Sequence, residues 1–136
     1  MKIIEYFDDS RVESADVFTA LQFAAALALK STHPLSSLIV EEVEKSQKVK
    51  VCDIAESFSE TNIGMSALIT KNSNEKTRFY LGSADYVTNA LKIPMSDIDS
   101  RAKKYLKTKQ TVLLLANQYR LLNYIIIGGS KDNTAI

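Results

Sequence analysis

The feature that most constrains the fold is the presence of two pairs of apolar segments. In each pair, a short polar turn joins the two segments. Residues 65–70 and 77–81 flank the polar run 72–75, and residues 111–116 precede 121–127 across a second polar turn. Tight polar turns of this kind join antiparallel neighbours. The two pairs of segments therefore predict two hairpins and a mainly antiparallel sheet.

The remaining segments predict helices and two further strands. Helices are expected at 15–30, 34–45, 84–91 and 96–107, and strands at 2–7 and 48–54. Ser14 or Asp16 can cap the first helix, and Pro34 suits the first turn of the second. With the four helices on one face, these elements predict a two-layer α+β domain around a sheet of about six strands.

The chain has 136 residues, which fits one domain over residues 1–127 followed by a tail or linker at 128–136. Its 17 Lys and Arg against 16 Asp and Glu give a net charge of +1. This balance creates no general attraction to nucleic acid or to an anionic membrane, so neither is expected as a partner. The single cysteine, Cys52, excludes an internal disulfide and is interpreted as a small core residue.

No apolar run approaches the roughly 20 residues that a membrane-spanning helix needs. The longest, at 24–29, stops at Lys30, and the first residues do not have the pattern of a signal peptide. Any membrane role is therefore expected to come from something attached to this chain.

Most catalytic templates are missing from the sequence. It contains no P-loop, no G-x-G-x-x-G and no G-x-S-x-G, and one His with one Cys makes a poor zinc site. His33 is the most suggestive residue, because it precedes the proline that opens a helix. A helix N-terminus suits an anion such as phosphate, although His33 also fits a capping or packing role. A basic stretch from Arg101 to Lys109 fits either a solvated helix face or a phosphate contact.

The run Ser31-Thr32-His33-Pro34-Leu35 resembles the Ser-Glu-His-Pro-Leu motif in the nucleotide-binding domain of heavy-metal-transporting P-type ATPases. The order of later features strengthens the resemblance, which covers about residues 12–127. A Gly-containing turn ends at Gly64, and a hairpin ends at Gly82-Ser83. Two helices follow, and then a strand that begins Lys109-Gln110-Thr111-Val112-Leu113.

The resemblance implies a twisted antiparallel sheet flanked by two helix pairs. It implies a cytosolic domain that holds ATP, as Mg-ATP in the parent pump, for transfer to an aspartate in a phosphorylation domain. ATP or ADP and the phosphorylation and actuator domains would be its partners. His33 would orient the nucleotide, Gly64 would allow close backbone approach, and Phe58 would contribute to the adenine pocket. The nucleotide-binding residues expected on this basis are His33, Phe58, Asn62, Gly64, Gly82 and Ser83.

Several positions depart from the family pattern. Ala28, Thr32, Asn62 and Ser83 stand where the family has Glu, Glu, Gly and Asn. Phe58 with Gly82-Ser83 also resembles the related domain of the potassium-transporting Kdp pump. The changed residues at Ala28, Asn62 and Ser83 leave an alternative, a degenerate module with weak or no nucleotide binding that acts in protein interaction or regulation.

The family's phosphorylated Asp-Lys-Thr-Gly-Thr motif is absent from this sequence. The isolated chain is therefore expected to bind nucleotide without turning it over. A small unrelated enzyme that uses His33 as an acid or base is a third alternative, for which the sequence offers no partner group.

Overall fold

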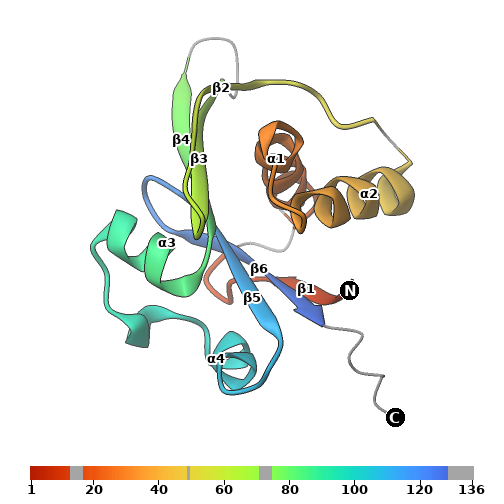
Figure 1. Ribbon diagram of the computed structural model, residues 1–136. Coiled ribbons are helices and arrows are strands. Elements are labelled where there is room, and N and C mark those ends of the chain that lie inside the picture. The colour runs from red at the N-terminus through yellow and green to blue at the C-terminus, as the bar shows by residue number, and fades with distance from the viewer. Residues whose placement is uncertain (13–16, 49, 71–74, 129–136) are drawn as a thin grey trace.

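The computed structural model describes residues 1–12, 17–48, 50–70 and 75–128, without the side chains of residues 17–19. Figure 1 shows how the elements are arranged. Their order along the chain is β1 (Lys2–Asp8), α1 (Val17–Lys30), α2 (Ser36–Gln47), β2 (Ala55–Glu60), β3 (Gly64–Thr70), β4 (Lys76–Gly82), α3 (Ala84–Leu91), the short 3-10 helix η2 (Met95–Asp97), α4 (Ser100–Leu106), β5 (Thr111–Asn117) and β6 (Leu121–Gly128).

The six described strands form one sheet in the order β1-β6-β5-β4-β3-β2, and every neighbouring pair is antiparallel. The two predicted hairpins are β3 with β4 and β5 with β6. They meet through β4 and β5, whose pairing sets Leu81 opposite Leu115. β1 lies against β6, with Tyr6 opposite Ile125, so the first and last strands are neighbours. The predicted antiparallel sheet is confirmed.

The helices cover both faces of the sheet, one pair on each (Figure 1). α1 and α2 pack against Phe79 and Ile125, whereas α3 and α4 pack against Leu114, Tyr124 and Ile126. The expectation that all four helices lie on one face is wrong. β5 and β6 contain consecutive apolar residues, so both faces of these strands carry apolar side chains and both must be covered by helices. The observed arrangement is the two flanking helix pairs that the resemblance implies.

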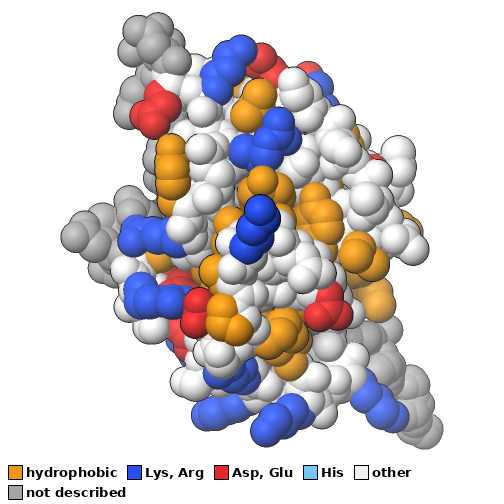
Figure 2. Space-filling view, turned by 90° about the vertical axis from the view of Figure 1, so that its left-hand side faces the viewer, with side chains coloured by type: hydrophobic (Ala, Val, Ile, Leu, Met, Phe, Trp, Pro, Cys, Tyr) orange, Lys and Arg blue, Asp and Glu red, His pale blue; other side chains and the backbone are white. Residues whose placement is uncertain are grey.

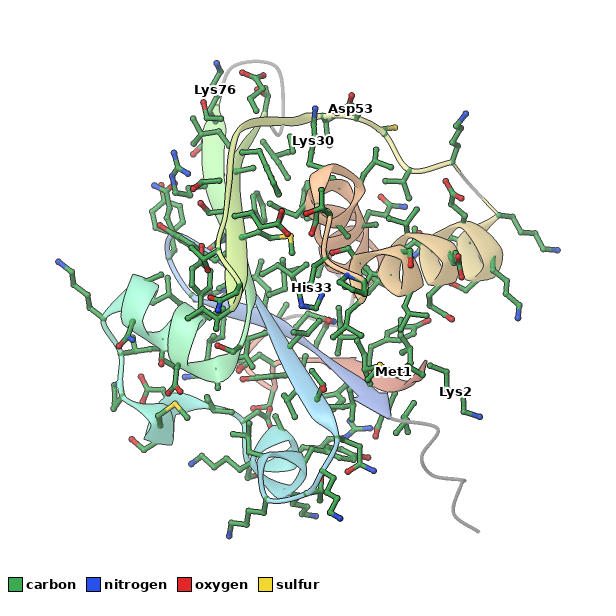
Figure 3. All side chains as sticks on the ribbon, in the orientation of Figure 1. Met1, Lys2, Lys30, His33, Asp53 and Lys76 are labelled. Atoms are coloured by element: carbon green, nitrogen blue, oxygen red, sulfur yellow. The ribbon has the colours of Figure 1, made fainter. Side chains whose placement is uncertain are left out.

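Residues 50–54 form no strand, although their alternating pattern predicts one. The strand begins later, as β2, which is an edge strand paired with β3. Two contacts hold the 50–54 segment near the helices instead. The Val51 N–H donates to Glu44 Oε2 at 3.1 Å, and Lys30 Nζ lies 2.7 Å from Asp53 Oδ1 (Figure 3). An alternating pattern makes a strand only where a neighbouring strand can pair with it.

Cys52 is exposed, so its interpretation as a core residue is wrong. Cys52 follows Val51 directly, so even a strand that buried Val51 would have turned the Cys52 side chain to the opposite face, with Lys50. Outside a strand, its Sγ lies 4.0 Å from the carbonyl of Lys50 and faces solvent.

The start of α4 is set by Asp99. Its side chain accepts the Arg101 N–H at 3.0 Å, so the helix begins at Ser100 rather than at residue 96. Residues 95–97 form the 3-10 helix η2 instead. α2 begins at Ser36, two residues after Pro34.

Five of the predicted features fall partly or wholly outside the described residues. These are the cap by Ser14 or Asp16, residues 15 and 16 of the first predicted helix, Val49 of the predicted strand at 48–54, the turn at 72–75 except Glu75, and the tail from residue 129 onward. Gly128, expected to begin the tail, is the last residue of β6.

Candidate functional site

A cavity of about 190 Å³ lies between the start of α2, the β2–β3 turn and β4 with β5. Five of the six residues expected to bind nucleotide line it: His33, Asn62, Gly64, Gly82 and Ser83. They come from separate segments, which only the fold brings together. Its other lining residues are mainly apolar, with a few polar side chains among them: Leu35, Ser36, Ile39, Glu60, Thr61, Ile63, Met65, Leu81, Thr111, Val112 and Leu113. An apolar hollow with a few convergent polar groups is the usual form of a small-molecule site.

His33 lies in the turn between α1 and α2, three residues before the first residue of α2. Figure 3 places its imidazole between the start of α2 and the sheet. The ring nitrogen Nδ1 accepts the Leu35 N–H at 3.1 Å, and the His33 carbonyl accepts the Ser36 N–H at 3.0 Å. Because Nδ1 is an acceptor, the neutral ring carries its proton on Nε2, which is then available as a donor.

The β2–β3 turn is organised by Thr61. Its Oγ1 accepts the N–H groups of Ile63 and Gly64, both at 3.2 Å, and its own N–H donates to the Gly64 carbonyl at 2.8 Å. The turn exposes Asn62 at the cavity while Gly64 enters β3. A hydroxyl two or three residues before the N–H groups it binds is a common way to stabilise such a turn.

The glycines at 64 and 82 are required by packing on the α3 side of the sheet. They stand opposite each other in β3 and β4. A Cβ at Gly64 would lie 2.2 Å from the ring of Tyr86, and one at Gly82 would lie 2.6 Å from the Gly64 backbone. The expected reason for glycine at 64, room for a ligand, is not what the structure shows, because Tyr86 fills that room. A backbone contact from Gly64 to nucleotide stays a prediction.

Ser83 has a structural role that explains its presence. Its Oγ accepts the Tyr86 N–H at 3.2 Å and caps α3, and its N–H donates to the Ile63 carbonyl at 2.9 Å. These bonds hold the end of β4 next to the β2–β3 turn. Ser83 thereby fixes the shape of one side of the cavity.

Phe58 is the one expected residue that does not line the cavity. It is half-buried and packs against the core beneath α1 and α2. Ala28 is buried in α1 and, with Thr32 and His33, borders a separate and more open hollow on the other side of the turn. The structure therefore keeps Phe58 and Ala28 apart from the residues around Asn62.

Glu60 is a site residue that sequence reasoning missed. It ends β2, lines the cavity and is half-buried. Its carboxylate binds the His33 turn, accepting from the Ser31 hydroxyl and from the Thr32 N–H. A carboxylate two residues before Asn62 was the available signal, but its partners lie 28 and 29 residues away in the chain.

The basic stretch from Arg101 to Lys109 belongs to α4 and the turn after it. Within the described part of the chain, none of its side chains lines the cavity. Arg101 pairs with Glu5, and Lys103 Nζ donates to the Ser96 carbonyl at 3.0 Å. Figure 2 shows several Lys and Arg side chains at the lower end of its face, the end at which Figure 1 places α4. This agrees with a solvated helix face.

Among the described residues, no group of three or more His, Cys, Asp or Glu side chains is arranged to hold a metal ion. None of the helices in the described ranges is long and apolar enough to cross a membrane.

No family model and no curated protein matches the chain. Solved structures do. The N-domain of HMA8, a copper-transporting P-type ATPase, superposes with a TM-score of 0.68 at 22% identity over 94% of this chain and 100% of that one. A zinc-transporting PIB-type ATPase in its E2.Pi state gives a TM-score of 0.67 at 21% identity, over 92% of this chain and 18% of the transporter.

A third match is the catalytic domain of the CPx-ATPase CopB-B, a structure concerned with conformational changes upon nucleotide binding. It gives a TM-score of 0.57 at 14% identity, over 94% of this chain and 37% of that one. The three likenesses show that this chain has the fold of the N-domains of heavy-metal P-type ATPases. The resemblance noted in the sequence is confirmed at the level of the fold.

Proposed function

We propose that this chain is the ATP-binding domain of a cation-transporting P-type ATPase. It would hold ATP, as Mg-ATP, for phosphoryl transfer to an aspartate in a separate phosphorylation domain on the cytosolic side. The observation that carries the proposal is the cavity itself. Five residues indicated by the sequence resemblance, from separate segments, line one hollow in a chain with the N-domain fold.

The shape of the cavity suits part of a nucleotide. Its volume of about 190 Å³ is below the range of roughly 300–1,000 Å³ that is typical of pockets enclosing a drug-sized ligand. Apolar side chains such as Ile39, Met65 and Leu81 suit the faces of a purine ring. The sugar and the phosphates would then extend beyond the cavity, where a phosphorylation domain can reach the γ-phosphate.

His33 would orient the bound nucleotide. Its Nδ1 is held by the Leu35 N–H, so Nε2–H is the group left to donate to an acceptor on the ligand. Asn62 and Ser83 add polar side chains to the lining of the cavity. Mg²⁺ would travel with the phosphates and be positioned by groups in other domains.

A second candidate function is a module of the same fold without a working nucleotide site, acting in protein interaction or regulation. Ala28 favours it, because a buried alanine supplies no polar contact where the family has Glu. Losing hydrogen-bond partners of this kind costs about 1 kcal/mol or more each.

An NMR titration with ATP, ADP and AMP, with and without Mg²⁺, distinguishes the two candidates. The proposal predicts saturable shifts at His33, Asn62, Gly64, Gly82 and Ser83. His33→Ala should weaken ATP binding about tenfold while the chain stays folded. Ser46→Ala, at the far end of α2, is the matched control and should bind as the parent does.

Either of two results would reject the nucleotide proposal or the role of His33. If no shift is seen at millimolar ATP, the chain is not a nucleotide-binding domain and the second candidate stands. If His33→Ala binds ATP as tightly as Ser46→Ala, the site works without the imidazole.

A further inference from the structure

Glu60 connects the sheet to the turn that carries His33. Its Oε2 accepts from the Ser31 hydroxyl, and its Oε1 accepts the Thr32 N–H at 3.4 Å. The Ser31 oxygen in turn accepts the His33 N–H at 2.9 Å. A continuous series of hydrogen bonds therefore runs from the end of β2 to the backbone of His33.

Besides the packing of α1 and α2 on either side of it, this connection ties the turn to the sheet. The other hydrogen bonds of residues 31–33 are local, from Ser31 N–H to the Ala28 carbonyl, from Leu35 N–H to His33 Nδ1 and from Ser36 N–H to the His33 carbonyl. Local bonds fix the conformation of a turn but not where it lies against another element. The two bonds to Glu60 join residues 28 and 29 positions apart, and they set the turn against β2.

We propose that Glu60 is a positioning residue of the nucleotide site. Its carboxylate holds the 31–33 turn against β2 and so aims the His33 imidazole into the cavity. Both carboxylate oxygens are engaged with the turn, so Glu60 acts through His33 rather than on the ligand. The inference rests on the proposed function, because it assigns a role within that site.

The test is a double-mutant cycle on ATP affinity, measured by calorimetry or NMR. Glu60→Ala and Ser31→Ala should each weaken ATP binding about tenfold, and the double variant should bind no more weakly than either single one, because both break the same connection. Glu60→Gln keeps an acceptor for the turn and should recover most of the affinity. Glu56→Ala is the matched control: Glu56 is also on β2, but it pairs with Lys76 away from the cavity.

A second readout needs no nucleotide. In Glu60→Ala, the Thr32 and His33 amides should exchange with solvent about tenfold faster, and the His33 ring signals should shift. Amides of β3 and β4 should keep their parental rates, which shows that the fold is intact.

The outcomes separate this inference from the function on which it rests. If the parent binds ATP and Glu60→Ala binds equally well, the positioning role is wrong and the nucleotide site stands. Effects that multiply in the double variant would also reject it, because Glu60 and Ser31 would then act independently. If the parent binds no nucleotide at millimolar concentration, the proposed function fails and the role of Glu60 in it fails too.

Discussion

The two faces of the sheet carry polar clusters that differ in burial. On the α3–α4 side, the Asp9 cluster consists of Asp9, Arg11, Asp99 and Tyr124. Asp9 is 1% exposed and Tyr124 is fully buried, and the Tyr124 hydroxyl donates to Asp9 Oδ2 at 2.5 Å. On the α1–α2 side, Glu60 and Ser31 are half-buried and His33 is exposed.

Because of this difference in burial, we expect the Asp9 cluster to stabilise the fold and the residues around Glu60 to act mainly on nucleotide binding. The hydrogen bond from Tyr124 to Asp9 is buried, in a region of low dielectric constant, and it involves a charged acceptor, whereas the Arg11 side chain that pairs with Asp9 is 57% exposed. Arg11 Nε lies 2.8 Å from Asp9 Oδ1, and the Asp99 N–H donates to the Tyr124 hydroxyl at 3.0 Å. Breaking a buried hydrogen bond is costly because the partner that stays buried cannot bind water instead. Bonds around Glu60 compete with solvent, so they can direct His33 while adding little to the free energy of unfolding.

The largest effect is expected for Asp9→Ala. It removes the acceptor of the buried Tyr124 hydroxyl and the partner of Arg11. Its free energy of unfolding should fall by about 3 kcal/mol, measured by urea denaturation. Asp53→Ala, which breaks the surface pair with Lys30, is the control and should cost less than about 1 kcal/mol. Equal effects for the two variants would contradict the comparison.

Gly64→Ala should cost about 2 kcal/mol, because its Cβ would lie 2.2 Å from the Tyr86 ring. In a Tyr86→Ala background the same change should cost much less, since the ring that it meets is gone. Urea titrations of the four chains measure this coupling. An undiminished cost in the Tyr86→Ala background would show that glycine is needed at 64 for another reason.

Acid should destabilise the chain through the Asp9 cluster. Burial raises the pKa of Asp9, but hydrogen bonds from Arg11 and Tyr124 and the charge of Arg11 outweigh it, so the pKa is lowered overall. A lowered pKa contributes stability above the unfolded value of about 3.9, and this stability is lost as the pH falls through the folded value. The urea midpoint of the parent should therefore drop as the pH falls below about 4.

Asp9→Ala is the control for this pH dependence and should show a smaller drop over the same range. A part of the drop should persist, because the pKa of Asp99 is also lowered: burial raises it, but hydrogen bonds from Arg101 and Ser10 outweigh burial. An identical drop in Asp9→Ala would assign acid sensitivity to other carboxylates.

The smallest effect on stability is expected for Glu60→Ala. Its hydrogen bonds to the turn are partly or fully exposed, so the free energy of unfolding should fall by about 1 kcal/mol or less. Urea denaturation beside Asp9→Ala gives the comparison directly. A loss as large as that of Asp9→Ala would mean that Glu60 is chiefly a structural residue.

The hairpins and the sheet were predictable because their signals are local. Turn residues lie next to apolar runs in β3–β4 and β5–β6, and the turn chemistry and the run length act within a few residues. The 50–54 segment shows the limit of such signals. Its pattern of polar and apolar residues favours a strand, but Lys30 and Glu44 bind it near the helices and no described strand pairs with it.

Part of the candidate site was predictable for the same reason. His33 beside Pro34, the Asn62–Gly64 turn and Gly82-Ser83 are short motifs, and the structure gathers them around one cavity. Phe58 was expected there too, but the register irregularity between Glu56 and Ser59 and the packing of α1 decide where its ring lies. Glu60 was missed because its partners are distant in sequence.

The sequence by itself determined the order of elements, the antiparallel sheet and the likeness of its motifs to those of a P-type ATPase N-domain. Propensity, turn chemistry and hydrophobic period all act over a few residues, so they can be read without the fold. Tertiary structure alone decided that Phe58 lies away from the cavity, that Tyr86 requires Gly64, and that Glu60 binds the His33 turn. Each of these depends on contacts between distant segments, and such contacts exist only once the chain has folded.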